Sequence, residues 1–171
     1  SCLRTLTGHT DAVTECVWAP DGSPLVTTPR DRTARGGSRG AWSGRRRLTG
    51  DTKGVTACAW APGGAALVTT SVDMTARVWS AGDWSWLRTL TGHTDSVRAC
   101  AWAPGGAALV TASWDRTARV WSGGDWSCLR TLTGHTSLVL ACAGAQGGST
   151  RVTASADRQA REWGAEEGGP V

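Results

Sequence analysis

Phenylalanine, tyrosine, isoleucine and asparagine are absent from this sequence of 171 residues, and methionine and lysine occur once each. Because these six residue types use AT-rich codons, the simplest explanation is a GC-rich coding sequence. The same bias explains why 18 basic side chains include a single lysine, Lys53. We therefore do not interpret the arginines, or the modest net charge of +4, as evidence of nucleic-acid binding.

The chain also lacks the features of membrane and secreted proteins. It contains no apolar run of about 18 residues, which excludes a membrane-spanning helix. No basic and apolar leader is visible, so a secretory signal is not expected. With 40% hydrophobic residues the sequence is too apolar for a wholly disordered chain, and its length suits one domain.

An internal repeat organises the sequence. Segments of the type Leu-Thr-Gly-His-Thr recur every 42 residues without a gap, and three further columns keep their offsets. Such a period is typical of repeat architectures. We predict one repeat domain, 1–163, with repeats at about 1–42, 43–84, 85–126 and 127–163, followed by a polar tail, 164–171.

The third repeat shows the strand pattern most clearly. Its apolar or alternating segments are 84–90, 97–102, 108–112 and 117–121, and turn residues separate them. Four short antiparallel strands in about 40–45 residues are typical of one propeller blade.

Three motifs recur in phase with these strands: Gly92-His93, Asp115 in a tight turn, and Val120-Trp121. In this arrangement the chain resembles the WD-repeat, or WD40, family over nearly its whole length, although serine replaces the aspartate that usually follows the tryptophan. The resemblance implies an all-β fold, a WD40-type β-propeller. It also implies that the first strand of each unit is the outer strand of the preceding blade.

The resemblance further implies a buried, hydrogen-bonded tetrad of histidine, hydroxyl, aspartate and tryptophan in each complete repeat. The matching residues are His93, Thr111, Asp115 and Trp121 in the third repeat, and His135, Thr153, Asp157 and Trp163 in the fourth. We interpret them as structural, because a catalytic pair would occur once whereas these recur from blade to blade. Burial is tolerable when each donor has an acceptor.

The other repeats depart from this pattern. Gly36-Gly37 replaces Val-Trp in the first repeat, Asp51 replaces histidine in the second, and Gly144 replaces a tryptophan in the fourth. Residues 36–47 are predicted as a loop with a poor strand. Its run Arg45-Arg46-Arg47 indicates a degenerate strand, with phosphate binding as the alternative. We expect the first blade to be the least stable.

The number of repeats leaves ring closure open. Propellers have about four to eight blades, and the resemblance most often implies seven. We favour an arc of a longer array, because the sequence starts within a repeat and without methionine. Alternatively, four blades stand alone, with segment 2–6 completing the last one, or copies self-associate into a larger ring.

Motifs of common enzyme and metal sites are absent. The sequence has no GK[ST] loop, no GxSxG elbow and no HExxH motif, and its three histidines share one column.

The cysteines also follow the repeat: Cys16, Cys58, Cys100 and Cys142 form one column, and Cys2 and Cys128 another. We expect no catalysis, cofactor, metal or disulfide. Free thiols indicate a reducing, intracellular compartment, most simply the cytoplasm, with the nucleus not excluded.

Columns that vary between near-identical repeats are candidates for recognition, and in the resembled family they surround the channel mouth on one face. The candidate partner-binding residues are Arg30, Val72, Arg98, Trp114, Leu138 and Leu140. Arginine and tryptophan are enriched at binding hot spots; drift in a decaying array is the alternative. Trp42, Trp84 and Trp126 share another column, which either covers blade edges or exposes an aromatic ring.

The sequence therefore predicts a non-catalytic scaffold that binds proteins or peptides through one propeller face, since loops on rigid frameworks carry recognition. This step also rests on family analogy. One alternative is a regulatory propeller module of a larger enzyme or ubiquitin-ligase-type complex. Another is a nucleic-acid-associated WD-repeat protein, the weaker case, and no membrane partner is expected.

Overall fold

The fold is that of a computed structural model, which describes residues 2, 10–22, 25–29, 33–37, 46–51, 53–145 and 150–164. These residues form fifteen β-strands, and no helix occurs among them. Within this part of the chain there is accordingly no helix capable of crossing a membrane. The prediction of an all-β fold is confirmed.

The strands form four antiparallel sheets, which we call blades one to four. Blade one contains β1 (Val13–Trp18), β2 (Leu25–Pro29), β3 (Thr33–Gly37) and β4 (Arg46–Thr49). Blade two contains β5 (Val55–Trp60), β6 (Ala66–Ser71), β7 (Ala76–Ser80) and β8 (Trp86–Leu90). Blade three contains β9 (Val97–Trp102), β10 (Ala108–Ser113), β11 (Ala118–Ser122) and β12 (Cys128–Leu132). Blade four contains β13 (Val139–Gly144), β14 (Thr150–Ser155) and β15 (Ala160–Gly164).

Each blade follows chain order, so every strand pairs with its sequence neighbours. Short turns produce this arrangement. After β9, for example, the amide of Gly106 donates to the carbonyl of Ala103 at 2.8 Å, and Gly106 adopts a φ of 73° that favours glycine. The poor strand predicted within 36–47 is β4, which pairs with β3 through Arg46 and Gly36; residues 38–45 lie outside the described part.

A bulge interrupts the inner strand pair of every blade. In blade three, Ala99 pairs with Ala112 and Val97 pairs with Ser113, so Arg98 between them has no partner on β10. The same shift occurs at Thr14, Thr56 and Leu140 in the other blades. A bulge of this kind redirects the side chain of the extra residue.

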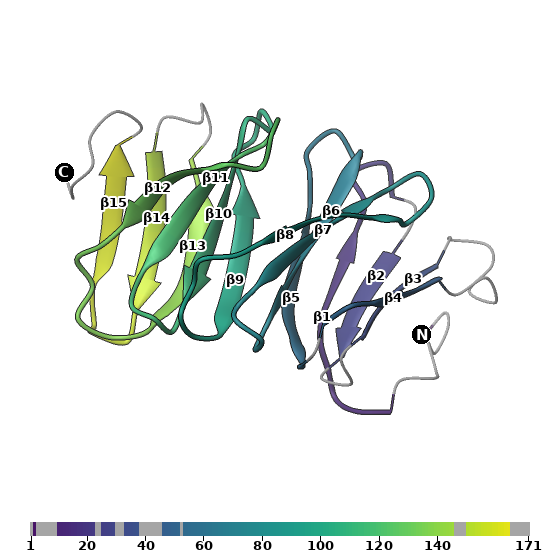
Figure 1. The fold of residues 1–171 in the computed structure, drawn as a ribbon, viewed down its shortest axis with the longest axis horizontal. Coiled ribbons are helices and arrows are strands. Elements are labelled where there is room, and N and C mark those ends of the chain that lie inside the picture. Colours follow the sequence, from purple (N-terminus) through teal and green to yellow (C-terminus); the bar gives the residue numbers. More distant parts are fainter. Residues whose placement is uncertain are drawn as a thin grey trace.

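The four blades lie in an open row (Figure 1), with blade one at one end and blade four at the other. The inner strands β1, β5, β9 and β13 contact one another in that order. No described strand pairs with the outer edge of β15. The described residues therefore have the open-arc form. Of the segment 2–6, expected as the closing strand, residues 3–6 lie outside the described part.

The core consists of three apolar clusters, each between neighbouring blades. Val26 and Leu67 belong to the first, Val68 and Trp121 to the second, and Val110 and Trp163 to the third, together with smaller residues. Because blades two and three are covered on both sides, every residue of β6 and β10 is buried. In β1, by contrast, most residues are exposed.

Candidate functional site

The recurring polar residues of blades three and four meet inside their blades. His93 Nδ1 lies 2.7 Å from Asp115 Oδ2, and His93 Nε2 lies 2.8 Å from Thr111 Oγ1. Trp121 Nε1 donates to the same hydroxyl at 2.9 Å. In blade four the corresponding distances among His135, Asp157, Thr153 and Trp163 are 2.7, 2.8 and 2.8 Å.

These contacts leave the histidines no free nitrogen with which to transfer a proton. The aspartates are held as anions. Burial alone would raise the pKa of Asp115, but hydrogen bonds from His93 and Thr117 outweigh it and place that pKa well below its usual range. In blade four, desolvation would raise the pKa of Asp157, but hydrogen bonds from His135 and from the amides of Thr136 and Gln159 together outweigh it and lower that pKa to about 2.

Blade two contains a different network, which the sequence analysis did not anticipate. The guanidinium of Arg77 donates to the carboxylate of Asp51, to Asp73 Oδ2 at 2.9 Å and to Thr75 Oγ1 at 2.8 Å. Burial raises the pKa of Asp51 to about 6, although Arg77 acts in the opposite direction. The missing histidine is thus replaced by an ion pair. The signal was available, because an arginine lies two residues before the closing tryptophan in repeats two to four.

The two tryptophans Trp84 and Trp126 are half-buried and make edge-to-face contacts with Trp60 and Trp102, at ring-centroid distances of 5.8 and 5.7 Å. The ring of Trp84 also covers Gly36, where an added Cβ would come within 2.6 Å of Trp84 Cη2. Trp84 and Trp126 therefore pack between blades instead of forming an exposed ring. Gly36 is the residue that leaves room for Trp84. Trp42, His9 and Asp31 lie outside the described residues.

The variable columns come together at one face of the row. In blade three, the amide of Trp114 donates to the carbonyl of Ser96 at 3.0 Å. The same bond joins Val72 to Gly54 and Ala156 to Leu138. The Cζ atom of Arg98, the bulge residue, lies 4.5 Å from the centre of the Trp114 ring, within cation–π distance.

A hollow of about 610 Å³ opens beside this pair. Its lining residues come from blades one to three: Thr14, Gly54, Val55, Thr56, Val72, Ser96, Arg98 and Trp114. Three of the candidate residues, Val72, Arg98 and Trp114, thus share one concave site. Leu138 and Leu140 lie in blade four and do not line it, and Leu140 is 48% exposed. Arg30 lies outside the described residues.

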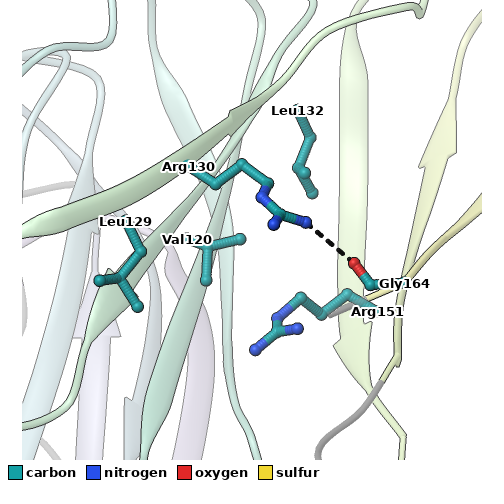
Figure 2. A pocket seen from close by; sticks show the side chains of 6 residues that line it. All are labelled: Val120, Leu129, Arg130, Leu132, Arg151 and Gly164. Carbon is teal, nitrogen blue, oxygen red and sulfur yellow. Dashed lines mark hydrogen bonds between the residues drawn. The ribbon is translucent and has the colours of Figure 1, made fainter. Parts of the chain in front are cut away.

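A second, smaller cavity of about 90 Å³ lies where β12 meets blade four (Figure 2). Arg130 Nη1 donates to the carbonyl oxygen of Gly164 at 3.0 Å. Desolvation, and to a lesser extent the charge of Arg130, lower the pKa of Arg151 on the same cavity. The room suffices for only a few water molecules, so we assign this contact to blade packing.

The described residues contain no cluster of three His, Cys, Asp or Glu side chains that could hold a metal ion. Cys58, Cys100 and Cys142 occur on the inner strands β5, β9 and β13. Burial raises the pKa of the Cys142 thiol to about 12, and it raises those of Cys58 and Cys100 well above their usual value. These cysteines are therefore thiols at neutral pH and behave as small apolar residues.

Comparison with known proteins agrees with this architecture. The family model for the WD domain, G-beta repeat, matches residues 1–35, 42–80, 84–122 and 126–164. A search among curated proteins gives no match. The segments 42–80, 84–122 and 126–164 each begin with the outer strand of one blade, β4, β8 or β12, and continue with the first three strands of the next blade, as the resemblance implied. Since the four matched segments cover most of the chain, the resemblance stated from the sequence is confirmed, and the chain belongs to the WD40 repeat family.

Proposed function

We propose that this chain is a non-catalytic scaffold that binds protein or peptide partners through the surface formed by Val72, Ser96, Arg98 and Trp114, hereafter the Arg98 face. WD40 repeats generally mediate protein interactions as scaffolds. The observation that carries the proposal is the hollow of about 610 Å³, which lies within the size range of ligand sites. Five of its lining residues differ from their counterparts in all the other repeats: Gly54, Val72, Ser96, Arg98 and Trp114.

The surroundings of the hollow favour binding over catalysis. Among the described residues that line the hollow there is no histidine, cysteine or carboxylate. The nearby histidines, His93 and His135, use both ring nitrogens in buried hydrogen bonds. General acid–base catalysis needs a group that can reach the substrate with a free proton or lone pair, and the described residues of the hollow supply none.

The framework beneath the Arg98 face is rigid, which favours recognition. The loop residue Trp114 is fixed by its backbone bond to Ser96 and by the ring contact with Arg98. The following residue, Asp115, is anchored in the tetrad of blade three. Side chains fixed before binding lose little conformational entropy when a partner arrives.

The test compares partner binding by matched double variants. In the first, Arg98→Ala is combined with Trp114→Ala; in the control, Trp86→Ala is combined with Leu87→Ala on the outer strand β8. Trp86 and Leu87 are 61% and 48% exposed, so their replacement also removes an exposed aromatic and an exposed aliphatic side chain. Circular dichroism establishes that both variants fold.

Proteins retained by each immobilised variant are then quantified against the parent chain by mass spectrometry. We expect the Arg98/Trp114 variant to lose partners that the control variant retains. The proposal fails if the first variant keeps the full set of partners, or if partners are lost only from the Trp86/Leu87 variant.

A further inference from the structure

The electrostatic character of the hollow identifies what it binds. We infer that the hollow takes an anionic side chain of an extended peptide, a carboxylate or a phosphate, with Arg98 as its counter-ion and apolar side chains beside it. This inference rests on the proposed function, because it assigns a partner chemistry to the same Arg98 face.

The first argument is the charge of the lining residues. Arg98 is the one charged residue among the described residues that line the hollow, and no carboxylate faces it there. No described residue makes an ion pair or a hydrogen bond with its guanidinium; its identified contact is with the Trp114 ring. Because a guanidinium has five N–H donors and a ring contact through Cζ consumes none of them, these donors remain available for an anion.

A second donor in the same corner also lacks an acceptor. Trp114 Nε1 is buried and has no hydrogen-bond partner among the described residues. A buried donor without an acceptor is costly, so the Trp114 ring would gain a hydrogen bond by turning this nitrogen toward a ligand oxygen beside Arg98. Both donors favour a ligand with several acceptor oxygens, as carboxylates and phosphates have.

The remaining lining residues indicate a peptide, not a free ion. The hydroxyls of Thr14 and Thr56 donate to the carbonyls of Thr28 and Val97, at 2.6 Å each, and their oxygens lie 3.3 and 2.8 Å from the hydroxyls of Thr28 and Thr70. Each oxygen therefore has one lone pair left to accept a hydrogen bond from an N–H group of a ligand backbone. Val55 and Val72 contribute apolar surface to the same hollow, and its volume of about 610 Å³ exceeds what a small ion would fill.

The identity of the bulge residue explains why this site is in blade three. The bulge occurs in every blade, and its extra residue is threonine in blades one and two, arginine in blade three and leucine in blade four. The turn column holds tryptophan only in the third repeat among repeats two to four. Among the described blades, blade three is thus the one in which an arginine at the bulge lies beside a tryptophan in the turn.

The experiment uses heptapeptides Ala-Ala-Val-X-Val-Ala-Ala in which X is glutamate, phosphoserine, glutamine or lysine. Each is titrated into the ¹⁵N-labelled chain while the indole N–H signal of Trp114, assigned by its loss in Trp114→Phe, is followed by NMR. We expect saturable shifts with glutamate and phosphoserine, and binding at least about tenfold weaker with glutamine and lysine. The ratio between the first two peptides distinguishes a carboxylate from a phosphate ligand.

Two variants test whether Arg98 causes the preference for an anionic side chain. Arg98→Gln should remove the discrimination between the glutamate and glutamine peptides. The control Arg116→Gln, at an exposed arginine two residues beyond Trp114, should preserve it. Equal binding of the glutamate and glutamine peptides overturns the inference, as does a preference that survives Arg98→Gln or the absence of any saturable shift.

These outcomes are distinguishable from failure of the proposed function. If all four peptides shift the Trp114 signal equally, the Arg98 face binds peptides and only the anionic preference is wrong. If no peptide shifts that signal and the Arg98/Trp114 double variant retains its partners, the proposed function is wrong as well.

Discussion

The hydroxyl of Thr111 is the residue on which the buried network of blade three depends. It contacts His93 Nε2 at 2.8 Å and accepts from Trp121 Nε1 at 2.9 Å, and the residue is fully buried. Removing one such group leaves two ring nitrogens without a partner in an interior that water does not reach. The cost of the substitution is therefore desolvation of the nitrogens more than loss of a contact.

We expect Thr111→Val, which keeps the shape of the side chain, to lower the free energy of unfolding by about 1–3 kcal/mol. The control is Thr131→Val on the outer strand β12. This substitution should change the free energy of unfolding by less than about 0.5 kcal/mol. Urea denaturation followed by tryptophan fluorescence measures both. Similar losses in the two variants would mean that the Thr111 hydroxyl has no special role.

As pH rises, the titration of Asp51 changes the stability of the fold in the opposite direction from the titration of the tetrad aspartates. Its pKa is raised from 3.8 to about 6 by burial, so the folded chain binds more protons than the unfolded chain between these values. Stability should consequently fall as pH rises from about 4 to about 6, by an amount on the order of 1–3 kcal/mol. Asp115 stays ionised throughout this window, because its folded pKa is lower still.

The variant Asp51→Asn should lack this fall, since it carries no titrating proton at that position. Urea denaturation of parent and variant at about pH 4.5 and about pH 6.5 measures the difference. Asp73 remains as a counter-ion for Arg77 in the variant. An identical pH dependence in both chains would show that Asp51 titrates at its ordinary pKa.

At the scale of strands and blades, position in the row determines stability. The inner strand β9 of blade three contacts β5 on one side and β13 on the other, whereas β1 contacts only β5 among the described inner strands. Val13 and Trp18 on β1 are 50% and 49% exposed as a result. Blade three also has a complete tetrad.

We therefore expect slower amide hydrogen exchange in residues 97–121 than in residues 13–37. Exchange measured by mass spectrometry on peptic fragments gives the comparison within one sample. Exchange that is equal in the two segments, or slower in blade one, would contradict both the sequence-based expectation and this packing argument.

At the scale of the whole molecule, the outer edge of β15, with which no described strand pairs, is the feature with the largest consequence. Residues 1–10 are identical to residues 127–136, the segment that contains β12. In blade three, β12 pairs with β11, whose sequence Ala-Arg-Val-Trp closely matches Ala-Arg-Glu-Trp of β15. An exposed strand edge readily accepts another strand.

We expect the chain to self-associate as its concentration rises, with residues 1–6 of one copy pairing with β15 of another. Sedimentation equilibrium measures the association, and deletion of residues 1–6 should abolish it. Deletion of residues 165–171 is the control of similar length. Association that is unaffected by the first deletion, or a parent chain that stays monomeric at all concentrations, would contradict the expectation.

The sequence by itself determined the repeat and the strands, and its resemblance to the WD40 family identified the tetrad residues. Strand 97–102 was predicted with the bounds that β9 has; β10 ends one residue later than predicted, and β11 both begins and ends one residue later. These features are readable because turns and strand alternation depend on neighbours a few residues away. The 42-residue period then placed His93, Thr111 and Asp115 in phase before any distance was known.

Only the tertiary structure decided how those elements meet. The bulge that frees Arg98, the ion pair of Asp51 with Arg77, and the fit of Trp84 over Gly36 all join segments that are distant in the chain. Such contacts follow from strand register and from packing between blades, where one residue of shift changes which side chain faces which. The repeat pattern specified the blades, but their mutual packing created the hollow beside Arg98 and left β15 as an edge among the described strands.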